Sequence, residues 1–217
     1  MKKPVYKELT LATLPLTFIF LLFSLMTFIP GYPILCGTFF ICLGMFQSWQ
    51  KAREDNDILY SVLLPIRKSD VVKGKYAAAV FIQLVAFMLC AVFTFIRMFF
   101  MSEAAVYKAN FMMSANLVYL SFVLLIFAAF NVIFIGGFFK TAYALGKPFV
   151  FFIITNFIII AIAETLHHIP SLSWLNADDF SFIGRHLIAF VTSFFVYVIS
   201  TVISCKVSQK RFENTDL

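Results

Sequence analysis

The chain has 217 residues, of which 62% are hydrophobic and 13% are charged, and its formal net charge is +6. Water-soluble domains are about 45–50% apolar and about 25% charged, and a chain of this size cannot hide such an excess in one core surrounded by water. The composition therefore excludes an ordinary soluble domain and predicts a protein whose apolar surface faces lipid. The sequence also lacks a G-x-x-x-x-G-K-[ST] motif, so the chain does not hold ATP phosphates in that way.

Six apolar stretches approach the roughly 20 residues that a helix needs to cross a bilayer. They are Leu9–Ile29, Pro33–Gln47, Tyr76–Phe100, Met113–Phe138, Pro148–Leu166 and Ile183–Cys205. Backbone groups in lipid must be satisfied within their own segment, so each stretch is expected to be a helix. Pro15 is expected to kink the first helix, which we expect to be retained rather than cleaved as a signal peptide. We predict an all-α integral membrane fold with six transmembrane helices, in a single domain over residues 1–217.

Most Lys and Arg residues lie in the N-terminal arm, the loops after the second and fourth stretches, and the tail. Because cytoplasmic loops are enriched in Lys and Arg, this pattern places both termini in the cytoplasm of a multi-pass cell-membrane protein. Contact with anionic lipid headgroups is expected, and the charge requires no nucleic-acid partner. The cysteines have neither zinc-site nor disulfide spacing and are expected to be small buried hydrophobes; they are Cys36, Cys42, Cys90 and Cys205.

A charged segment between the second and third stretches is predicted to begin with a short amphipathic helix. The apolar residues that share one face of this helix are Ile58, Leu59, Val62 and Leu63. The carboxylates before it would complement a helix N-terminus or meet a basic partner, and they are Glu54, Asp55 and Asp57. Such a small apolar face binds lipid weakly but fits a groove on another protein. Two alternatives stay open, namely a helix that lies in the headgroup region and charges that serve only as topology signals.

The same segment then predicts a sharp elbow. Pro65 cannot continue the helix, and Ser69 is a suitable N-cap for a new helix that runs into the third stretch. The basic residues of the elbow and of the expected membrane surface are Arg67, Lys68, Lys73 and Lys75.

Polar residues within the apolar stretches are costly, so they are candidates for function. The amides among them are Gln83, Asn116, Asn131 and Asn156. Hydrogen bonding between helices is one explanation, and the lining of a translocation path is the other. Near the outer ends of their stretches, Arg97 and Glu164 are expected to pair with each other.

One group has a spacing that suggests a metal site. Glu164, His167 and His168 follow i, i+3, i+4 spacing, but they lack the H-E-x-x-H order of zinc hydrolases. We do not expect a metal site, and no set of residues converges as a catalytic centre, so the chain is not predicted to be an enzyme. A membrane-embedded metal-dependent hydrolase that uses these three residues stays as an alternative. Trp174, in the loop that follows, is expected to anchor that loop at headgroup depth.

The segment DILYSVLLPIRKSDVVKGKY, Asp57–Tyr76, resembles the cytoplasmic segment of ABC-2 type transporter permeases of the small bacterial branch. Their pattern is L-x-S-L-P-x-x-R-x-x-[IV]-V-x-x-[KR]-Y. The matching positions are Leu59, Ser61, Pro65, Arg67, Val71, Val72, Lys75 and Tyr76. This sequence has one more residue between Ser61 and Pro65 than the common spacing. Permeases of phenol-soluble modulin exporters and of lantibiotic immunity transporters are similar in size and layout.

The resemblance implies how such a chain works. The loop between the second and third helices would carry a coupling helix that docks on a separate ABC ATPase subunit, which binds ATP and Mg²⁺, so the chain itself needs no cofactor. Two permease chains would pair as a homodimer or heterodimer and export a small amphipathic or antimicrobial peptide. A non-transporting immunity or scaffold protein is a further alternative. The coupling residues would be Glu54, Asp55, Asp57, Ile58, Leu59, Val62, Leu63, Pro65, Arg67 and Lys68.

Overall fold

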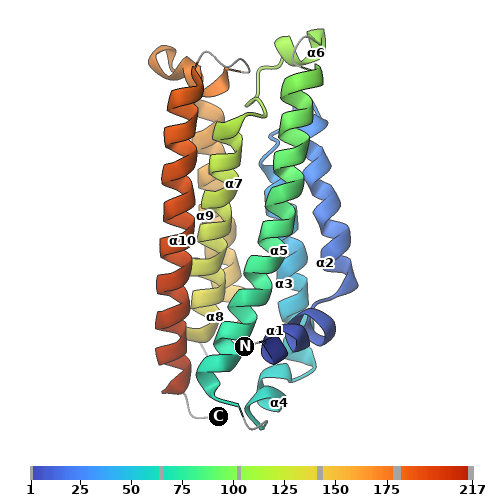
Figure 1. Ribbon diagram of the computed structural model, residues 1–217, viewed down its shortest axis with the longest axis vertical. Coiled ribbons are helices and arrows are strands. Elements are labelled where there is room, and N and C mark those ends of the chain that lie inside the picture. Colours follow the sequence, from blue (N-terminus) through green and yellow to red (C-terminus); the bar gives the residue numbers. More distant parts are fainter. Residues whose placement is uncertain (1, 64–65, 102–103, 141–143, 178–181, 215–217) are drawn as a thin grey trace.

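The computed structural model describes residues 2–63, 66–101, 104–140, 144–177 and 182–214 (Figure 1). Every regular element in these ranges is a helix, which confirms the expected all-α fold for that part of the chain. The first elements are α1 (Lys2–Lys7), the π-helix η1 (Glu8–Ala12), α2 (Pro15–Phe20), the 3₁₀-helix η2 (Leu21–Phe28), α3 (Cys36–Glu54), α4 (Asp57–Leu63), α5 (Lys68–Ile96) and the π-helix η3 (Arg97–Met101). The later elements are α6 (Ala105–Lys108), α7 (Leu117–Ala129), the π-helix η4 (Phe130–Ile135), α8 (Gly136–Lys140), α9 (Gly146–Leu166), the 3₁₀-helix η5 (Pro170–Asn176) and α10 (Ile183–Glu213).

Within the described ranges, four helical runs are long and apolar enough to cross a membrane. They are Lys68–Met101, Leu117–Lys140, Gly146–Leu166 and Ile183–Glu213, and they match the third to sixth predicted stretches. The first predicted stretch contains only a shorter apolar helix, Pro15–Phe28. The second forms α3, which continues past the predicted end at Gln47 into a polar C-terminal part.

The first predicted helix is interrupted rather than kinked. Thr13 and Leu14 have extended backbone between η1 and α2. Pro15 lies in the first turn of α2, where its missing N–H removes no helical hydrogen bond. The freed N–H of Leu14 donates to Ser48 Oγ on α3 at 2.9 Å. The prediction of a helix kinked at Pro15 is therefore wrong, because Pro15 begins a helix instead of bending one.

The long helices lie side by side along the long axis of the molecule (Figure 1). The helix α1, the helix α4, the start of α5 and the end of α10 gather at one end of this bundle, and α6 lies at the opposite end. The run from α7 through η4 to α8 is the most buried of the four long runs, and α7 packs most extensively against α10. Apolar side chains on the outer faces of α5, α9 and α10 are exposed, as contact with lipid requires; examples are Phe81, Phe151 and Phe195.

Two glycines allow α3 to approach the N-terminal helices closely. A Cβ on Gly37 would lie 2.5 Å from the carbonyl oxygen of Phe23, and a Cβ on Gly44 would lie 2.5 Å from the Cβ of Phe20. Both distances are too short for any larger residue, so these glycines permit close packing of helices, as membrane bundles often require. All four cysteines are free, with Cys42 and Cys90 buried.

Candidate functional site

The helix α4 lies at one end of the bundle, between α3 and α5 in sequence, where the amphipathic helix was predicted (Figure 1). Ile58 and Ser61 face the protein and are 5% and 1% exposed, whereas Tyr60 and Leu63 are 58% and 85% exposed. Residues three apart share a face of a helix, so these two pairs define a buried side and an exposed side. The prediction that Ile58 and Leu63 share one exposed face is therefore wrong, because Ile58 packs into the core of its own chain.

A residue in the left-handed region links α3 to α4. Asn56 has φ 52°, and Asn adopts this conformation more readily than most residues. Its carbonyl oxygen accepts a hydrogen bond from the N–H of Tyr60 at 3.0 Å, which starts the first turn of α4. Glu54 and Asp55 stay at the surface before this turn, and Asp55 pairs with Lys51 at 2.8 Å.

The elbow after α4 differs from the prediction in its cap. The helix α5 begins at Lys68, and Arg67 precedes it with extended backbone and no capping side-chain hydrogen bond. The prediction of Ser69 as the N-cap is therefore wrong, because Ser69 already lies inside the helix. Asp70 in the first turn pairs with Lys73 at 3.1 Å, and both side chains are 41% exposed. Three predicted coupling positions lie outside the described part of the chain: Pro65 and the side chains of Leu59 and Val62.

Four charged side chains from the N-terminal segment, α4 and α5 form a closed arrangement, which we call the ionic ring: Lys7, Glu8, Asp57 and Lys75. The Nζ of Lys75 lies 2.9 Å from Glu8 Oε2 and 2.8 Å from Asp57 Oδ2. The Nζ of Lys7 lies 3.4 Å from Glu8 Oε1 and also pairs with Asp57 Oδ1. Each lysine thus contacts both carboxylates, and positive and negative charges alternate around the ring.

The ring is buried, which corrects two predictions. The side chain of Lys75 is 4% exposed and that of Asp57 is 11% exposed. Lys75 is therefore enclosed by the protein and not exposed at a surface as predicted, and Asp57 meets two lysines of its own chain where a basic partner on another protein was expected. Buried charges are tolerated only when they are paired, and the ring provides that pairing with no net charge.

The state of Asp57 follows from its surroundings. Burial raises the pKa of the Asp57 carboxyl, but the charges and hydrogen bonds of Lys75 and Lys7 outweigh burial, so its pKa lies below the ordinary value. Ser61 completes the arrangement, because its Oγ accepts from Lys7 and donates to the carbonyl oxygen of Asp57 at 2.7 Å. The carboxyl of Asp57 is therefore ionised at neutral pH.

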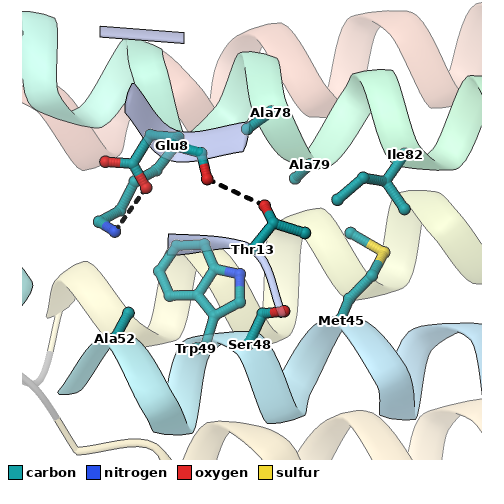
Figure 2. Close-up of a pocket in the computed structure, with 10 residues that line it drawn as sticks. Glu8, Thr13, Met45, Ser48, Trp49, Ala52, Ala78, Ala79 and Ile82 are labelled. Carbon is teal, nitrogen blue, oxygen red and sulfur yellow. Dashed lines mark hydrogen bonds and ion pairs between the residues drawn. The ribbon is translucent and has the colours of Figure 1, made fainter. Parts of the chain in front are cut away.

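Two cavities border the ring. The first, of about 30 Å³, is lined by Glu8, Thr13 and Trp49 among others, and Figure 2 shows Glu8 and Thr13 above the indole of Trp49. The second, of about 170 Å³, is lined by Trp49, Arg53 and Lys75 among others. The Nζ of Lys75 lies 5.2 Å from the centre of the Trp49 ring, in a cation–π contact. The ion pair of Asp57 with Lys75 therefore joins α4 to α5 beside these cavities.

A chain of hydrogen bonds, which we call the polar seam, joins α5, η4 and α10. The amides of Gln83 and Asn131 bond reciprocally, at 2.8 Å and 3.0 Å. Tyr197 donates to Gln83 Oε1 at 2.9 Å, and Asn131 donates to Thr201 Oγ1 at 3.0 Å. These two predicted intramembrane amides thus use their hydrogen-bonding groups to join helices.

Tyr76 connects the ionic ring to α10. It follows Lys75 directly, and its hydroxyl lies 2.8 Å from Ser204 Oγ and 3.0 Å from Ser208 Oγ. The same hydroxyl donates to the carbonyl oxygen of Asn131 at 3.3 Å. The ring and the seam are therefore linked through two neighbouring residues of α5, because Lys75 belongs to the ring and Tyr76 bonds to Asn131 of the seam.

The other two predicted amides behave differently from each other. Asn116 is the N-cap of α7, where its Oδ1 accepts from the N–H groups of Val118 and Tyr119, and its Nδ2 donates to the carbonyl oxygen of Leu175 at 2.8 Å. Asn156 on α9 is fully buried, and neither atom of its amide has a hydrogen-bond partner within the described structure.

At the opposite end of the bundle, the possible metal-binding group contacts the segment before α7. Its members are Glu164, His167 and His168. Glu164 Oε2 accepts from the N–H of Met113 at 2.9 Å, and His167 Nε2 lies 3.2 Å from the carbonyl oxygen of Phe111. The ring of His168 stacks on Phe111, with 4.3 Å between centroids. Among the described residues, no three His, Cys, Asp or Glu side chains come together as a set that could hold a metal ion.

Arg97 and Glu164 have other contacts instead of the predicted pair. Arg97 is 3% exposed, its Nη1 donates to the carbonyl oxygen of Thr27 at 2.7 Å, and its guanidinium lies 4.3 Å from the centre of the Tyr107 ring. In the loop after α9, the carbonyl oxygen of Trp174 lies 2.7 Å from Nε2 of His186. These contacts fix the loops at this end of the bundle.

Lys7 and Glu8 belong to the site but were not identified from the sequence. Lys7 is one of the basic residues of the N-terminal arm, which served only to predict the orientation of the chain in the membrane. Glu8 is an isolated carboxylate at the edge of the first apolar stretch, where an unpaired charge is costly. That position was the available signal, but its partners at positions 57 and 75 are too far away in sequence to be inferred from local pattern.

A family model described as ABC-2 family transporter protein matches residues 2–213 of the chain. Searches of curated proteins and of solved structures found no match.

Proposed function

The chain belongs to the ABC-2 family and is the transmembrane subunit of an ABC transporter, and from this premise we propose that it couples ATP hydrolysis by a separate ATPase subunit to export of a small amphipathic peptide. Its apolar helices and its family make it a membrane-embedded, multi-pass protein. Membrane subunits of this family are not themselves catalytic and normally pair with an ABC ATPase subunit. In the proposed complex that partner binds ATP and Mg²⁺.

The observation that carries this proposal is the exposed side of α4, which we call the docking face: Tyr60 and Leu63. Both side chains are more than half exposed. The face points away from the two buried residues of α4, Ile58 and Ser61, which anchor the helix to the bundle. Apolar residues on one side of a short anchored helix suit a groove on a partner protein. The surface carboxylates Glu54 and Asp55 lie near enough in sequence to meet basic residues of that partner.

The arrangement of the helices supports the rest of the proposal. The helix α3 packs against α2 and η2, and η2 packs against α5. We infer that the run Pro15–Phe28 and α3 also cross the membrane and bring the number of spans to six. The end of the bundle that carries α1, α4 and the end of α10 faces the cytoplasm in this proposal, in agreement with the distribution of Lys and Arg. A second permease chain, identical or related, would complete the path. The peptide cargo rests on the resemblance of Asp57–Tyr76 to permeases of phenol-soluble modulin exporters and lantibiotic immunity transporters.

Substitution on the docking face tests the proposal. Leu63→Asp and Tyr60→Asp are expected to abolish association with the ATPase subunit while the chain still inserts, because each places a charge on an exposed apolar surface. Tagged chains are purified from native membranes in mild detergent, and the bound proteins are identified by mass analysis.

The matched control is Phe111→Asp, because Phe111 is 73% exposed and lies in the loop before α7, at the opposite end of the bundle. It is expected to retain the ATPase. If the ATPase subunit remains bound in stoichiometric amounts to both docking-face variants, α4 is not the docking helix.

A further inference from the structure

We propose that the ionic ring and Tyr76 form a rigid joint that passes movement of α4 to α5 and then to α10, with the N-terminal segment as part of that joint. This inference rests on the proposed function, because it assigns the path by which movement of the docked helix reaches the bundle. It makes Lys7, Glu8, Lys75 and Tyr76 positioning residues for transport.

The first step is the attachment of α4 to α5. Asp57 contacts Lys75 at 2.8 Å through Oδ2 and contacts Lys7 through Oδ1. If α4 slides along α5 and away from the N-terminal segment, both pairs break and the buried carboxylate of Asp57 is left without a basic partner. Breaking a buried ion pair is far more costly than breaking an exposed one. Because a displacement of α4 from α5 would break the buried pair of Asp57 with Lys75, α4 and α5 are expected to move together.

The second step is the role of the N-terminal segment. Lys7 ends α1 and Glu8 begins η1, so two adjacent residues supply half of the ring. Lys7 contacts α4 through Asp57 and Ser61, and Glu8 contacts α5 through Lys75. The N-terminal segment therefore bridges the other two segments. Because the charges alternate, any single neutralisation leaves an excess charge in a buried site.

The third step takes movement from α5 to α10. The hydroxyl of Tyr76 bonds Ser204 and Ser208, one turn apart on α10. Further along α5, the polar seam repeats the connection through Gln83 to Tyr197. Hydrogen bonds are directional, so they fix the position of α10 along α5 more strictly than apolar contact does. A shift of α5 is therefore expected to carry α10 with it.

Hydrogen–deuterium exchange on the complex with its ATPase subunit tests the joint, with and without trapping by ATP and vanadate. In the wild type, trapping is expected to change exchange in α4, in the start of α5 and in the end of α10. The double variant Asp57→Asn with Lys75→Met removes one charge of each sign and leaves Lys7 and Glu8 paired, so the ring region stays neutral. In this variant the change in α4 is expected to persist while the changes in α5 and α10 are lost.

A second, milder variant tests the last step and keeps the experiment decisive if the double variant folds poorly. Tyr76→Phe removes only the hydroxyl, and it is expected to preserve the response of α5 and to abolish that of the end of α10, where Ser204 and Ser208 lie. The matched control is Asp70→Asn with Lys73→Met, an exposed pair near the start of the same helix, and it should respond as the wild type does. If the double variant and Tyr76→Phe both transmit the change to α10, the joint is refuted.

The chain alone in lipid nanodiscs gives a result that does not depend on the ATPase. The double variant is expected to raise the exchange of α4 amides above the wild-type rate, and the control pair is not. Unchanged exchange of α4 in the double variant would overturn the joint. A different outcome separates the two proposals. If the wild-type chain does not hold the ATPase subunit, but α4 exchanges faster in the double variant, the docking proposal is refuted and the joint remains supported.

Discussion

Lys75 shows how one buried charge constrains its surroundings. Its side chain is 4% exposed, and two carboxylates from different segments lie within 3 Å of its Nζ. An ammonium group in such a position requires ionised partners. Asp57 is one of those partners, and the low pKa of its carboxyl keeps it ionised at neutral pH.

The stability that Asp57 provides is expected to depend on pH. Asp57→Asn should lower the free energy of unfolding by about 2 kcal/mol at pH 7, less than the about 3–5 kcal/mol typical of a broken buried pair, because Glu8 still pairs with Lys75. The folded-state pKa of Asp57 lies below its ordinary value of 3.8. Its contribution is therefore complete above pH 3.8 and is lost as the pH falls through the lower folded-state pKa.

Unfolding of both proteins in detergent, followed by tryptophan fluorescence across pH, measures this difference. Asp70→Asn is the control, and because its partner is exposed it should change stability by about 0.5 kcal/mol or less. A difference between wild type and Asp57→Asn that already disappears between pH 8 and pH 6 would contradict the assignment.

At the scale of the elements, position in a helix decides whether a polar side chain stabilises the bundle. Asn131 and Gln83 lie on neighbouring helices at matching heights and satisfy each other. Asn156 is equally buried, but its amide is unsatisfied within the described structure. Asparagine is therefore expected to stabilise the bundle at position 131 and to destabilise it at position 156.

Replacement by leucine, which has a similar volume, is expected to separate these two cases. Asn131→Leu should destabilise the bundle by about 1–2 kcal/mol, because it removes several interhelical hydrogen bonds, each worth about 0.6 kcal/mol on average in a membrane, and leaves Gln83 without that partner. Asn156→Leu should be neutral or stabilising, because it removes a buried polar group that has no partner.

Thermal unfolding of the two variants in the same detergent measures the contrast. Equal losses for both variants would mean that Asn156 has a polar partner that the described structure does not contain. Since the two positions lie on different helices and bond to nothing in common, the effects of the two substitutions are expected to add.

At the scale of the whole molecule, the bundle has two chemically distinct ends. One end carries α1, α4 and the ionic ring, and the other carries α6 and the contacts of Glu164 and His167 (Figure 1). Lys and Arg are concentrated in the loops and tail of the first end. This asymmetry determines the orientation that we propose.

Labelling from outside the cell tests that orientation. With the native cysteines replaced, Phe111→Cys should react with a membrane-impermeant maleimide in intact cells, and Tyr6→Cys should react only after permeabilisation. Both side chains are more than 70% exposed, so access depends on their side of the membrane. Labelling of both sites after permeabilisation is the control, and labelling of Tyr6→Cys alone in intact cells would reverse the orientation.

Composition and hydropathy by themselves determined the class of this protein, because they are sums over many residues and do not depend on which residues meet. They predicted an all-α membrane protein and located four of its long helices. The pattern of Asp57–Tyr76 indicated the family that the match over residues 2–213 then established. Helix spacing also located α4, because that spacing is local.

Only the tertiary structure decided which side of α4 faces the protein and which charges are buried. Periodicity groups Ile58 with Leu63, but packing against the bundle buries Ile58 and leaves Leu63 exposed. Glu8 and Lys75 are 67 positions apart, and nothing local in the sequence links them. Charges so far apart meet only where helix packing brings their segments together, and for that reason the ionic ring and the polar seam became visible only in the folded chain.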